Sequence, residues 1–455
     1  MSDDFVKPLE GVLVLDFSQF LAGPVAAMRL ADLGARVIKI ERPKGGDIGR
    51  TLAFAGRTAD GDTISFHAMN RNKEGITADL KNPDDLVRVK ELVAQADVII
   101  QNFRPGVMER IGLDYDSVAA INPRIVYGSA SGYGDDGPWK DRPGQDLLAQ
   151  SVSGLPWLSG SADDGPVPVG LSIADHLTSC HIAQGVTALL FRRERTGRGG
   201  HAQTSLLEAM LDLQFELLST RLNDPSVTVT RGGAHSAHAF LSAPYGTYPT
   251  ADGYLALAMN PIPVIGELLG IDELVALTDP DAWWSQQKEI EALLAAHFAT
   301  HTTEHWLAIL DRADVWCAPV LTLDELVEHD GFAAVRMTQN VVRDAAHTAS
   351  GVDLTLATTR SPIRIDGRIL TNETPAPKLG QHNDAVRAEF GTGAPGVAAT
   401  PTSSPAEGAE GAASAAGAAS SEGAASAESA ATAAGAASAE TASAAAASLP
   451  AGAAR

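Results

Sequence analysis

The sequence VLVLDFSQFLAGPVAAMRLADLGARVIKI, residues 12–40, places two short apolar runs on either side of a helical pattern. The first run, 12–17, is of strand type. Gly23-Pro24 then opens the helical pattern, with proline near its first turn, and Gly34 occupies the place of a helix C-cap glycine. This strand–helix–strand order predicts parallel strands covered by helices.

The same alternation continues to about residue 135. Residues 83–96 form an amphipathic helical pattern, while 97–100 and 124–127 are apolar runs typical of buried strands. We therefore expect an α/β fold whose large domain is built on a parallel sheet covered by helices. Ligands on such sheets bind at the carboxyl ends of the strands. The segments expected there are 16–23, 41–46, 101–106 and 129–137.

Two long helical patterns end the large domain, and the segments after residue 225 predict a smaller α+β domain. Residues 172–192 and 205–222 form two long helical patterns, and 245–259 is typical of a hairpin that turns at 251–253. Further helices are expected at 263–277, 286–298 and 303–312. The predicted domains are 1–225 (large, ligand-binding), 226–330 (small), 331–390 (return to the large domain) and 391–455 (an Ala/Ser/Gly-rich disordered tail).

Bulk composition excludes several functional classes. The formal net charge is −22 over 455 residues, which argues against nucleic-acid binding. No stretch approaches the ~20 apolar residues of a membrane helix, and the acidic start of the chain does not resemble a signal peptide. Cys180 and Cys317 are too few and too far apart for a disulfide framework or a zinc motif. We expect a cytoplasmic protein without a membrane partner.

Familiar site motifs are missing from the sequence. No G-x-G-x-x-G follows the first strand, which disfavours a nicotinamide cofactor, and no G-x-S-x-G elbow indicates a serine hydrolase. His176 and His181 are five residues apart, which does not place them on one helical face, so no metal site is predicted.

Two features of the sequence indicate a functional site. Basic residues gather in or near the strand-end segments of an acidic protein, which favours a phosphate-bearing ligand, although solvated surface charges are the alternative. They are Arg42, Lys44, Arg50, Arg71, Lys73, Arg104 and Arg110. Asp175 lies near the start of a long predicted helix, where the helix dipole favours a carboxylate. An ordinary first-turn acid is the alternative there, and Asp146 could likewise be a helix cap.

An ordered series of motifs resembles the family III coenzyme A transferases, which include formyl-CoA transferase, carnitine CoA-transferase and α-methylacyl-CoA racemase. The resemblance covers residues 8–220 well and 235–385 more loosely. Its motifs are Pro8 to Val12, Leu15 to Phe17, Ala22 to Pro24, Leu33 to Pro43, Asn70 to Lys73, Asn102 to Gly106, Asn122 to Arg124, Gly132 to Gly134, Gly137-Pro138, Gly170 to Asp175 and Thr196 to Gly199.

The resemblance implies an interlocked homodimer in which each subunit has a Rossmann-like large domain and a smaller domain. It also implies that the protein acts on acyl-CoA and a small carboxylic acid, with no metal and no tightly bound cofactor. It places Asp175 at the family's catalytic aspartate, with Asp146 as a supporting carboxylate beside Gln145. The residues that it assigns to CoA binding are Leu21, Ala22, Arg42, Asn70, Arg71, Asn72, Lys73, Asn102, Phe103, Arg104, Arg110 and Arg142.

The implied chemistry is nucleophilic catalysis by a carboxylate, which forms an anhydride and then an aspartyl-CoA thioester. Racemases of this family typically carry His where this chain has Gln145, and glutamine has no pKa suited to proton abstraction, so transferase is favoured. A racemase or a non-catalytic acyl-CoA-binding protein are the alternatives. The loop 231–245 has two adjacent glycines, Gly232 and Gly233, where some transferases have a glycine-rich closing loop.

Overall fold

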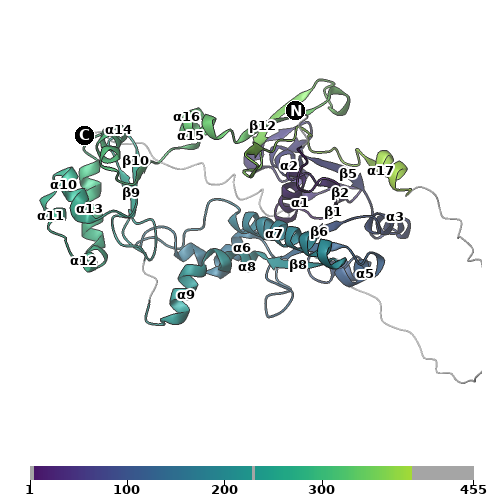
Figure 1. Ribbon diagram of the computed structural model, residues 1–455, viewed down its shortest axis with the longest axis horizontal. Coiled ribbons are helices and arrows are strands. Elements are labelled where there is room, and N and C mark those ends of the chain that lie inside the picture. Colours follow the sequence, from purple (N-terminus) through teal and green to yellow (C-terminus); the bar gives the residue numbers. More distant parts are fainter. Residues whose placement is uncertain (1–4, 228–230, 392–455) are drawn as a thin grey trace, which may run out of the picture. The chain divides into compact units, whose positions relative to one another are not determined.

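A computed structural model of the chain describes residues 5–227 and 231–391 (Figure 1). Residues 392–455, almost all of the predicted tail, lie outside the described residues. Within the described part, no helix has both the length and the apolar character that a membrane crossing requires.

A parallel sheet of six strands forms the centre of the fold. Its spatial order is β5-β2-β1-β6-β7-β8, and every neighbouring pair is parallel. In chain order this is the doubly wound arrangement, and the strand order reverses between β1 and β6. The strands are β1 (Leu13–Asp16), β2 (Arg36–Glu41), β5 (Lys73–Thr77), β6 (Val98–Gln101), β7 (Val126–Ser131) and β8 (Gly200–Ser205).

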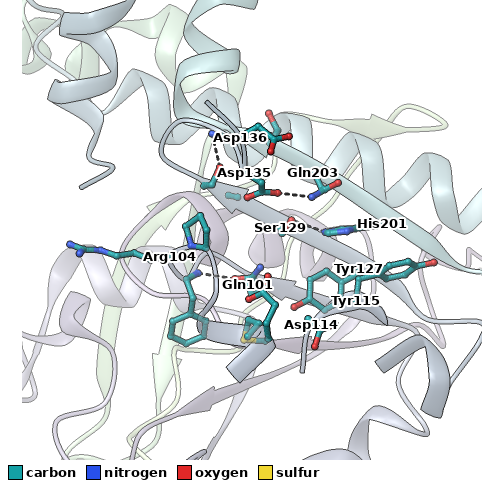
Figure 2. Close-up of a pocket in the computed structure, with 18 of the residues that line it drawn as sticks. Gln101, Arg104, Asp114, Tyr115, Tyr127, Ser129, Asp135, Asp136, His201 and Gln203 are labelled. Atoms are coloured by element: carbon teal, nitrogen blue, oxygen red, sulfur yellow. Dashed lines mark hydrogen bonds between the residues drawn. The ribbon is translucent and has the colours of Figure 1, made fainter. Parts of the chain in front are cut away.

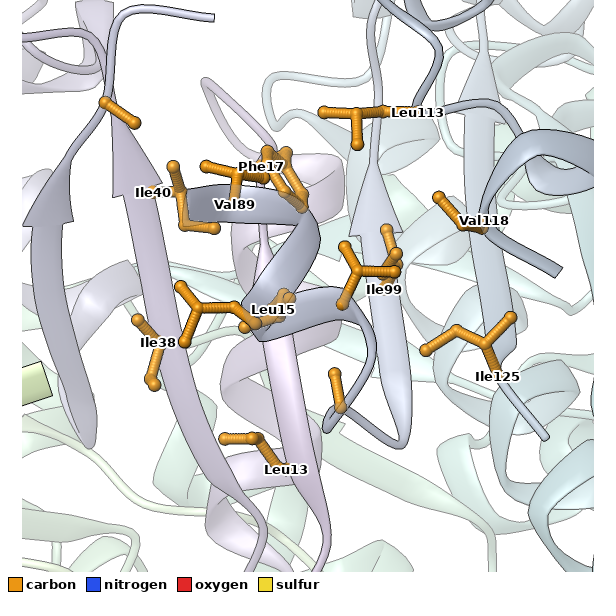
Figure 3. Close-up of a cluster of buried hydrophobic side chains, with 14 of the residues drawn as sticks. Leu13, Leu15, Phe17, Ile38, Ile40, Val89, Ile99, Leu113, Val118 and Ile125 are labelled. Atoms are coloured by element: carbon orange, nitrogen blue, oxygen red, sulfur yellow. The ribbon is translucent and has the colours of Figure 1, made fainter. Parts of the chain in front are cut away.

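Alternating side chains of the strands build two cores, because successive residues point to opposite faces. Val14 and Ile100 pack with α1 (Ala22–Asp32) and α7 (Ile173–Thr196) on one face, and these two helices pack against each other (Figure 1). Leu15 and Ile99 pack on the other face under α3 and α5, as Figure 3 shows. The remaining helices of this part are α2 (Ile64–Asn70), α3 (Pro83–Val93), α4 (Val107–Ile111), α5 (Tyr115–Ile121) and α6 (Asp146–Ser153), beside the two-residue strands β3 (Thr58–Ala59) and β4 (Asp62–Thr63).

The helical pattern 205–222 is not one helix. It breaks at Gln214 into α8 (Leu206–Leu213) and α9 (Phe215–Asn223). The buried Gln214 amide donates to the carbonyls of Met210 and Ser153, so it serves packing at the break. By contrast, α7 continues to Thr196 and ends at Gly197 in the left-handed conformation, a usual helix C-cap.

A second, antiparallel sheet has its own core. The predicted hairpin is confirmed, and β11 pairs with its second strand. The helix predicted at 263–277 is interrupted by Gly270, which caps α10 in the left-handed conformation. The elements are β9 (Gly246–Pro249), β10 (Tyr254–Leu257), β11 (Cys317–Pro319), α10 (Ile262–Leu269), α11 (Asp272–Val275), α12 (Pro280–Ser285), α13 (Gln287–Phe298) and α14 (Thr303–Leu310).

The last described segment returns to the parallel sheet. The backbone N–H of Gly75 in β5 donates to His382, and that of Thr77 donates to Asn383. The domain boundaries at 225, 330 and 390 stay a prediction. The elements here are α15 (Leu323–Glu328), α16 (Asp330–Val335), β12 (Thr338–Arg343), β13 (Leu354–Thr359), β14 (Arg364–Ile365), β15 (Arg368–Ile369) and α17 (Asn383–Phe390).

Candidate active site

Asp175 lies in the first turn of α7, where α1 also begins. The backbone N–H of Ala22, the first residue of α1, donates to the Asp175 carboxylate. The backbone N–H of Asp175 donates to Oδ2 of Asp146 at 3.1 Å. The fold therefore brings Ala22, Asp146 and Asp175, three residues of the predicted site, to one point.

The charge on Asp175 is unfavourable in this setting. Burial, and after it the nearby charge of Asp146, raises the pKa of Asp175 to about 7, while the hydrogen bond from Ala22 acts in the opposite direction. A carboxylate with such a pKa is a stronger base than a solvated one and is partly ionised at neutral pH. Perturbed carboxyl groups of this kind cluster at functional sites.

An open hollow of ≈ 300 Å³ borders this site, between the start of α6 and residues 168–172. Gln145, exposed at the N-cap of α6, lines it together with Asp146. Arg142 is exposed three residues earlier on the same loop. This loop packs closely against the end of β7. Gly144 of the loop lies so near Gly132, the residue after β7, that a Cβ added to Gly132 would be only 2.5 Å from the Cα of Gly144.

The side chains of Asn102 and Asp47 fix the backbone of the loop between β1 and α1. Asn102 accepts from the N–H of Gln19 at 2.8 Å and donates to its carbonyl at 2.7 Å. Oδ1 of Asp47 accepts from the N–H of Phe20 at 3.1 Å. Phe20 has a φ of 65°, which is strained for an aromatic residue and persists only where neighbouring contacts hold it. The loop thus reaches Ala22 in a single defined path.

Beneath that loop lies a buried ion network. Lys39 and Lys73 flank Asp16, and all three side chains have 0% exposure. Nζ of Lys39 donates to the carbonyl of Ser18 and pairs with Asp47 at 2.9 Å. Burial lowers the pKa of Lys73 to about 8 despite the opposing charge of Asp16. The network ties the end of β1 to β2 and β5 and supports the loop from below.

Four consecutive polar residues that the resemblance assigned to CoA have buried side chains: Asn70, Arg71, Asn72 and Lys73. Arg71 forms a bidentate pair with Asp32, and Lys73 bonds Asp16. The expectation that Arg71 and Lys73 lie in a strand-end segment is wrong, because Lys73 begins β5 at its amino end. Since both cations are neutralised in the core, neither offers its charge to a phosphate.

A second hollow of ≈ 230 Å³ lies at the point where the strand order reverses. Arg42 and Phe103, both predicted, line it, and Asn102 lies just before Phe103 at the end of β6. The loop 78–81, which follows β5, completes it with Leu80 and Lys81. Sequence reasoning missed these residues because β5 had not been recognised as a strand.

A third hollow, of ≈ 330 Å³, lies at the carboxyl ends of β6, β7 and β8 (Figure 2). Arg104 lines it, with acidic residues such as Asp135, whose carboxylate accepts from Gln203 at 2.7 Å. Ser129 lies 2.7 Å from Nε2 of His201 on the neighbouring strand. Arg110 is exposed on α4 and lines none of the hollows described.

Metal-binding side chains do not converge among residues 5–227 and 231–391: no group of three or more His, Cys, Asp or Glu is placed to hold an ion. His176 is exposed beside Asp175, and His181 instead pairs with Asp212 at 3.2 Å.

Known proteins resemble this chain in sequence and in fold. The family model described as CoA-transferase family III matches residues 9–383. The succinate–glutarate CoA-transferase of Agrobacterium fabrum is 31% identical, over 85% of this chain and 96% of that protein. The acetyl-CoA:oxalate CoA-transferase of Acetobacter aceti is 31% identical, over 84% and 96%. A crystal structure of a CaiB/BaiF family protein from Brucella suis, 32% identical, superimposes with a TM-score of 0.72 over 84% of this chain and 99% of that one.

Proposed function

The chain belongs to CoA-transferase family III and acts as a CoA-transferase, and we propose that it works through covalent intermediates on Asp175. The observation that carries this proposal is the contact between the Asp175 carboxylate and the N–H of Ala22 at the edge of an open hollow. A carboxylate held in this way can attack a thioester, and the neighbouring N–H can stabilise an oxyanion.

In the first step, an oxygen of Asp175 bonds to the thioester carbonyl carbon of the donor, and the carbon–sulfur bond breaks to release CoA thiolate. The thiolate then attacks the Asp175 carbonyl carbon of the mixed anhydride and expels the donor acid as a carboxylate. An acceptor carboxylate attacks the resulting aspartyl-CoA thioester and releases the thiolate again. The thiolate attacks the acceptor carbonyl of this second anhydride, which yields acceptor-CoA and restores the Asp175 carboxylate, with no net change in protons or electrons.

CoA itself is proposed to bind with its nucleotide end in the hollow at the strand-order reversal. Phe103, Leu80 and neighbouring apolar residues offer a surface for the base, and Arg42 and Lys81 offer positive charge for phosphates. Pantetheine would run along the loop between β1 and α1 toward Ala22 and Asp175. Arg104 and Arg110 are exposed near this route and stay predicted ligands.

Short dicarboxylic acids are the proposed acid substrates. Curated relatives of this chain are named as transferases for succinate and glutarate, for oxalate and for L-malate. All of these acids carry a second carboxylate or a hydroxyl that the protein can recognise beside the reacting carboxylate. A panel of such acids with succinyl-CoA as the donor is therefore the first activity screen.

A homodimer is proposed as the working assembly. Helices α15 and α16 bury no side chain within this chain, yet Leu323 is 79% exposed and Val327 58% exposed. Two helices this short are marginal unless an apolar face is covered. A second copy of the chain is the proposed cover, which accords with the interlocked dimer implied by the resemblance.

Replacing the proposed nucleophile tests the mechanism. Asp175→Ala should lower CoA transfer by roughly three orders of magnitude or more, because it removes the side chain on which the covalent intermediates are proposed to form. Asp116→Ala is the matched control, since Asp116 is also a first-turn acid, in α5. Mass spectrometry of the wild-type protein, quenched with succinyl-CoA alone, should show a CoA adduct on the peptide containing residue 175.

Two outcomes would contradict the proposal. One is transfer that survives in Asp175→Ala at the control's rate. The other is deuterium uptake at C2 of a 2-methylacyl-CoA without any CoA transfer, which would favour a racemase.

A further inference from the structure

Gln150, in the second turn of α6, uses its whole amide group in the core. The residue is only 2% exposed. Oε1 accepts from the backbone N–H of Val169 at 3.0 Å, and Nε2 donates to the carbonyl of Leu171 at 3.2 Å. Nε2 also donates to Oδ1 of Asp146 at 2.6 Å. Gln150 thereby joins α6 to the loop that leads into α7.

Asp146 passes this constraint on to the reacting group. One carboxylate oxygen is held by Gln150, and the other accepts the backbone N–H of Asp175. With both oxygens engaged, the Asp146 side chain has one orientation, and that orientation fixes the first turn of α7. Gln150 and Asp146 together form a two-step relay of hydrogen bonds that ends at Asp175.

We propose that Gln150 is a positioning residue for CoA transfer: it holds Asp146 and the loop 169–171 so that Asp175 faces the N–H of Ala22. This proposal rests on the proposed role of Asp175 as the nucleophile. Gln150 need not contact substrate, and it is buried behind Asp146. A small displacement of an attacking group costs a large part of the rate, so such a support matters to turnover.

A glutamine suits this position because the three partners demand both a donor and an acceptor. The N–H of Val169 needs an acceptor, while the carbonyl of Leu171 and the carboxylate of Asp146 need donors. An apolar side chain of the same length satisfies none of them. It leaves backbone groups unpaired and lets Asp146 turn away from α7.

Charged groups also lie on the helices that neighbour Asp146 and Asp175. Arg29 on α1, His176 on α7 and Glu208 on α8 lie on elements packed around this point. Of the charges on these elements, that of Asp146 acts on Asp175 and raises its pKa. If Asp146 is no longer held, that contribution shrinks, and Asp175 ionises at lower pH.

The test compares Gln150→Met with Gln214→Met. Gln214 is also buried and also donates two hydrogen bonds to carbonyls, but it bonds neither Asp146 nor Asp175. We expect kcat of Gln150→Met to fall about tenfold or more below that of Gln214→Met. The acid limb of its kcat/KM profile should move to lower pH by about half a unit. A merely destabilising change would not move that limb.

The proposal is overturned if Gln150→Met loses no more kcat than Gln214→Met, or if its acid limb stays at the wild-type position. If Gln150→Met fails to fold, Gln150→Asn serves as the test. Asparagine keeps the amide oxygen and nitrogen but holds them one methylene farther from their partners. Its losses should run in the same direction. Turnover that survives in Asp175→Ala would instead remove the nucleophile role itself, so the two failures are distinguishable.

Discussion

The carboxyl group of Asp175 ionises where burial and the charge of Asp146 both oppose it, with a pKa of about 7. Nucleophilic attack needs the ionised form, so activity should fall as pH drops through this value. Below it, kcat/KM should decrease about tenfold per pH unit, to roughly one hundredth of the plateau at pH 5. His176 does not account for a limb near pH 7, because partial desolvation of its ring, and then the charge of Arg29, lowers its pKa from the ordinary value of 6.5.

The measurement is kcat/KM for acyl-CoA between pH 5 and 9 with one fixed acceptor. Asp146→Asn provides the internal check, since it removes the charge that raises the pKa of Asp175 and should shift the limb to lower pH. A wild-type profile that stays flat from pH 5 to 8 would be inconsistent with an ionising Asp175.

Among the predicted site residues, the fold brings Asp175, Asp146 and Ala22 together, and the family resemblance was enough to name them. Sequence reasoning could not identify Gln150, whose partners are backbone groups of Val169 and Leu171 that only the folded chain brings near. It also misjudged Arg71 and Lys73. Their charges suggested a phosphate, while the structure pairs both with buried acids. Charge alone does not distinguish a ligand from a core ion pair.

At the scale of elements, the close contact between α1 and the loop before it supports the site. A Cβ on Gly23 would lie 2.2 Å from Cβ of Ser18, a distance that side chains cannot adopt without movement. Gly23→Ala should therefore cost about 1–3 kcal/mol of stability and displace the N–H of Ala22. We expect a lower melting temperature together with a reduced kcat.

Gly165→Ala is the control for Gly23→Ala, because nothing lies within 4 Å of its added Cβ. That variant should behave as wild type in both measurements. If Gly23→Ala also melts and turns over as wild type, the loop is less tightly constrained than its contacts indicate.

The central strands were predictable and the edge strands were not. β1, β2 and β6 are apolar runs because helices cover them on both faces. β5 and β8 have the sequences KEGIT and GHAQTS, and they border the sheet, where polar residues are tolerated. Missing β5 also concealed the loop 78–81 beside Arg42. Likewise, the break at Gln214 could not be read from the sequence, because no glycine or proline interrupts residues 206–223.

For the whole molecule, the apolar surface on α15 predicts association. Leu323 and Val327 are largely exposed and lie one helical turn apart, so they form one apolar stripe. We expect wild-type protein to sediment as a dimer of 47.3 kDa chains. The double variant Leu323→Glu/Val327→Glu should shift it toward monomer, since burying two carboxylates at an interface is costly.

Val87→Glu is the matched control for this double variant. Val87 is 57% exposed on α3, a helix whose opposite side packs in the core, so its outer face needs no further cover. Sedimentation velocity at several protein concentrations distinguishes the two cases. The control should keep the wild-type sedimentation coefficient, while the α15 variant should sediment more slowly and show it most clearly on dilution. If both variants remain dimers of equal stability, the stripe on α15 is not part of the interface, and α9, which also buries no side chain, becomes the next surface to test.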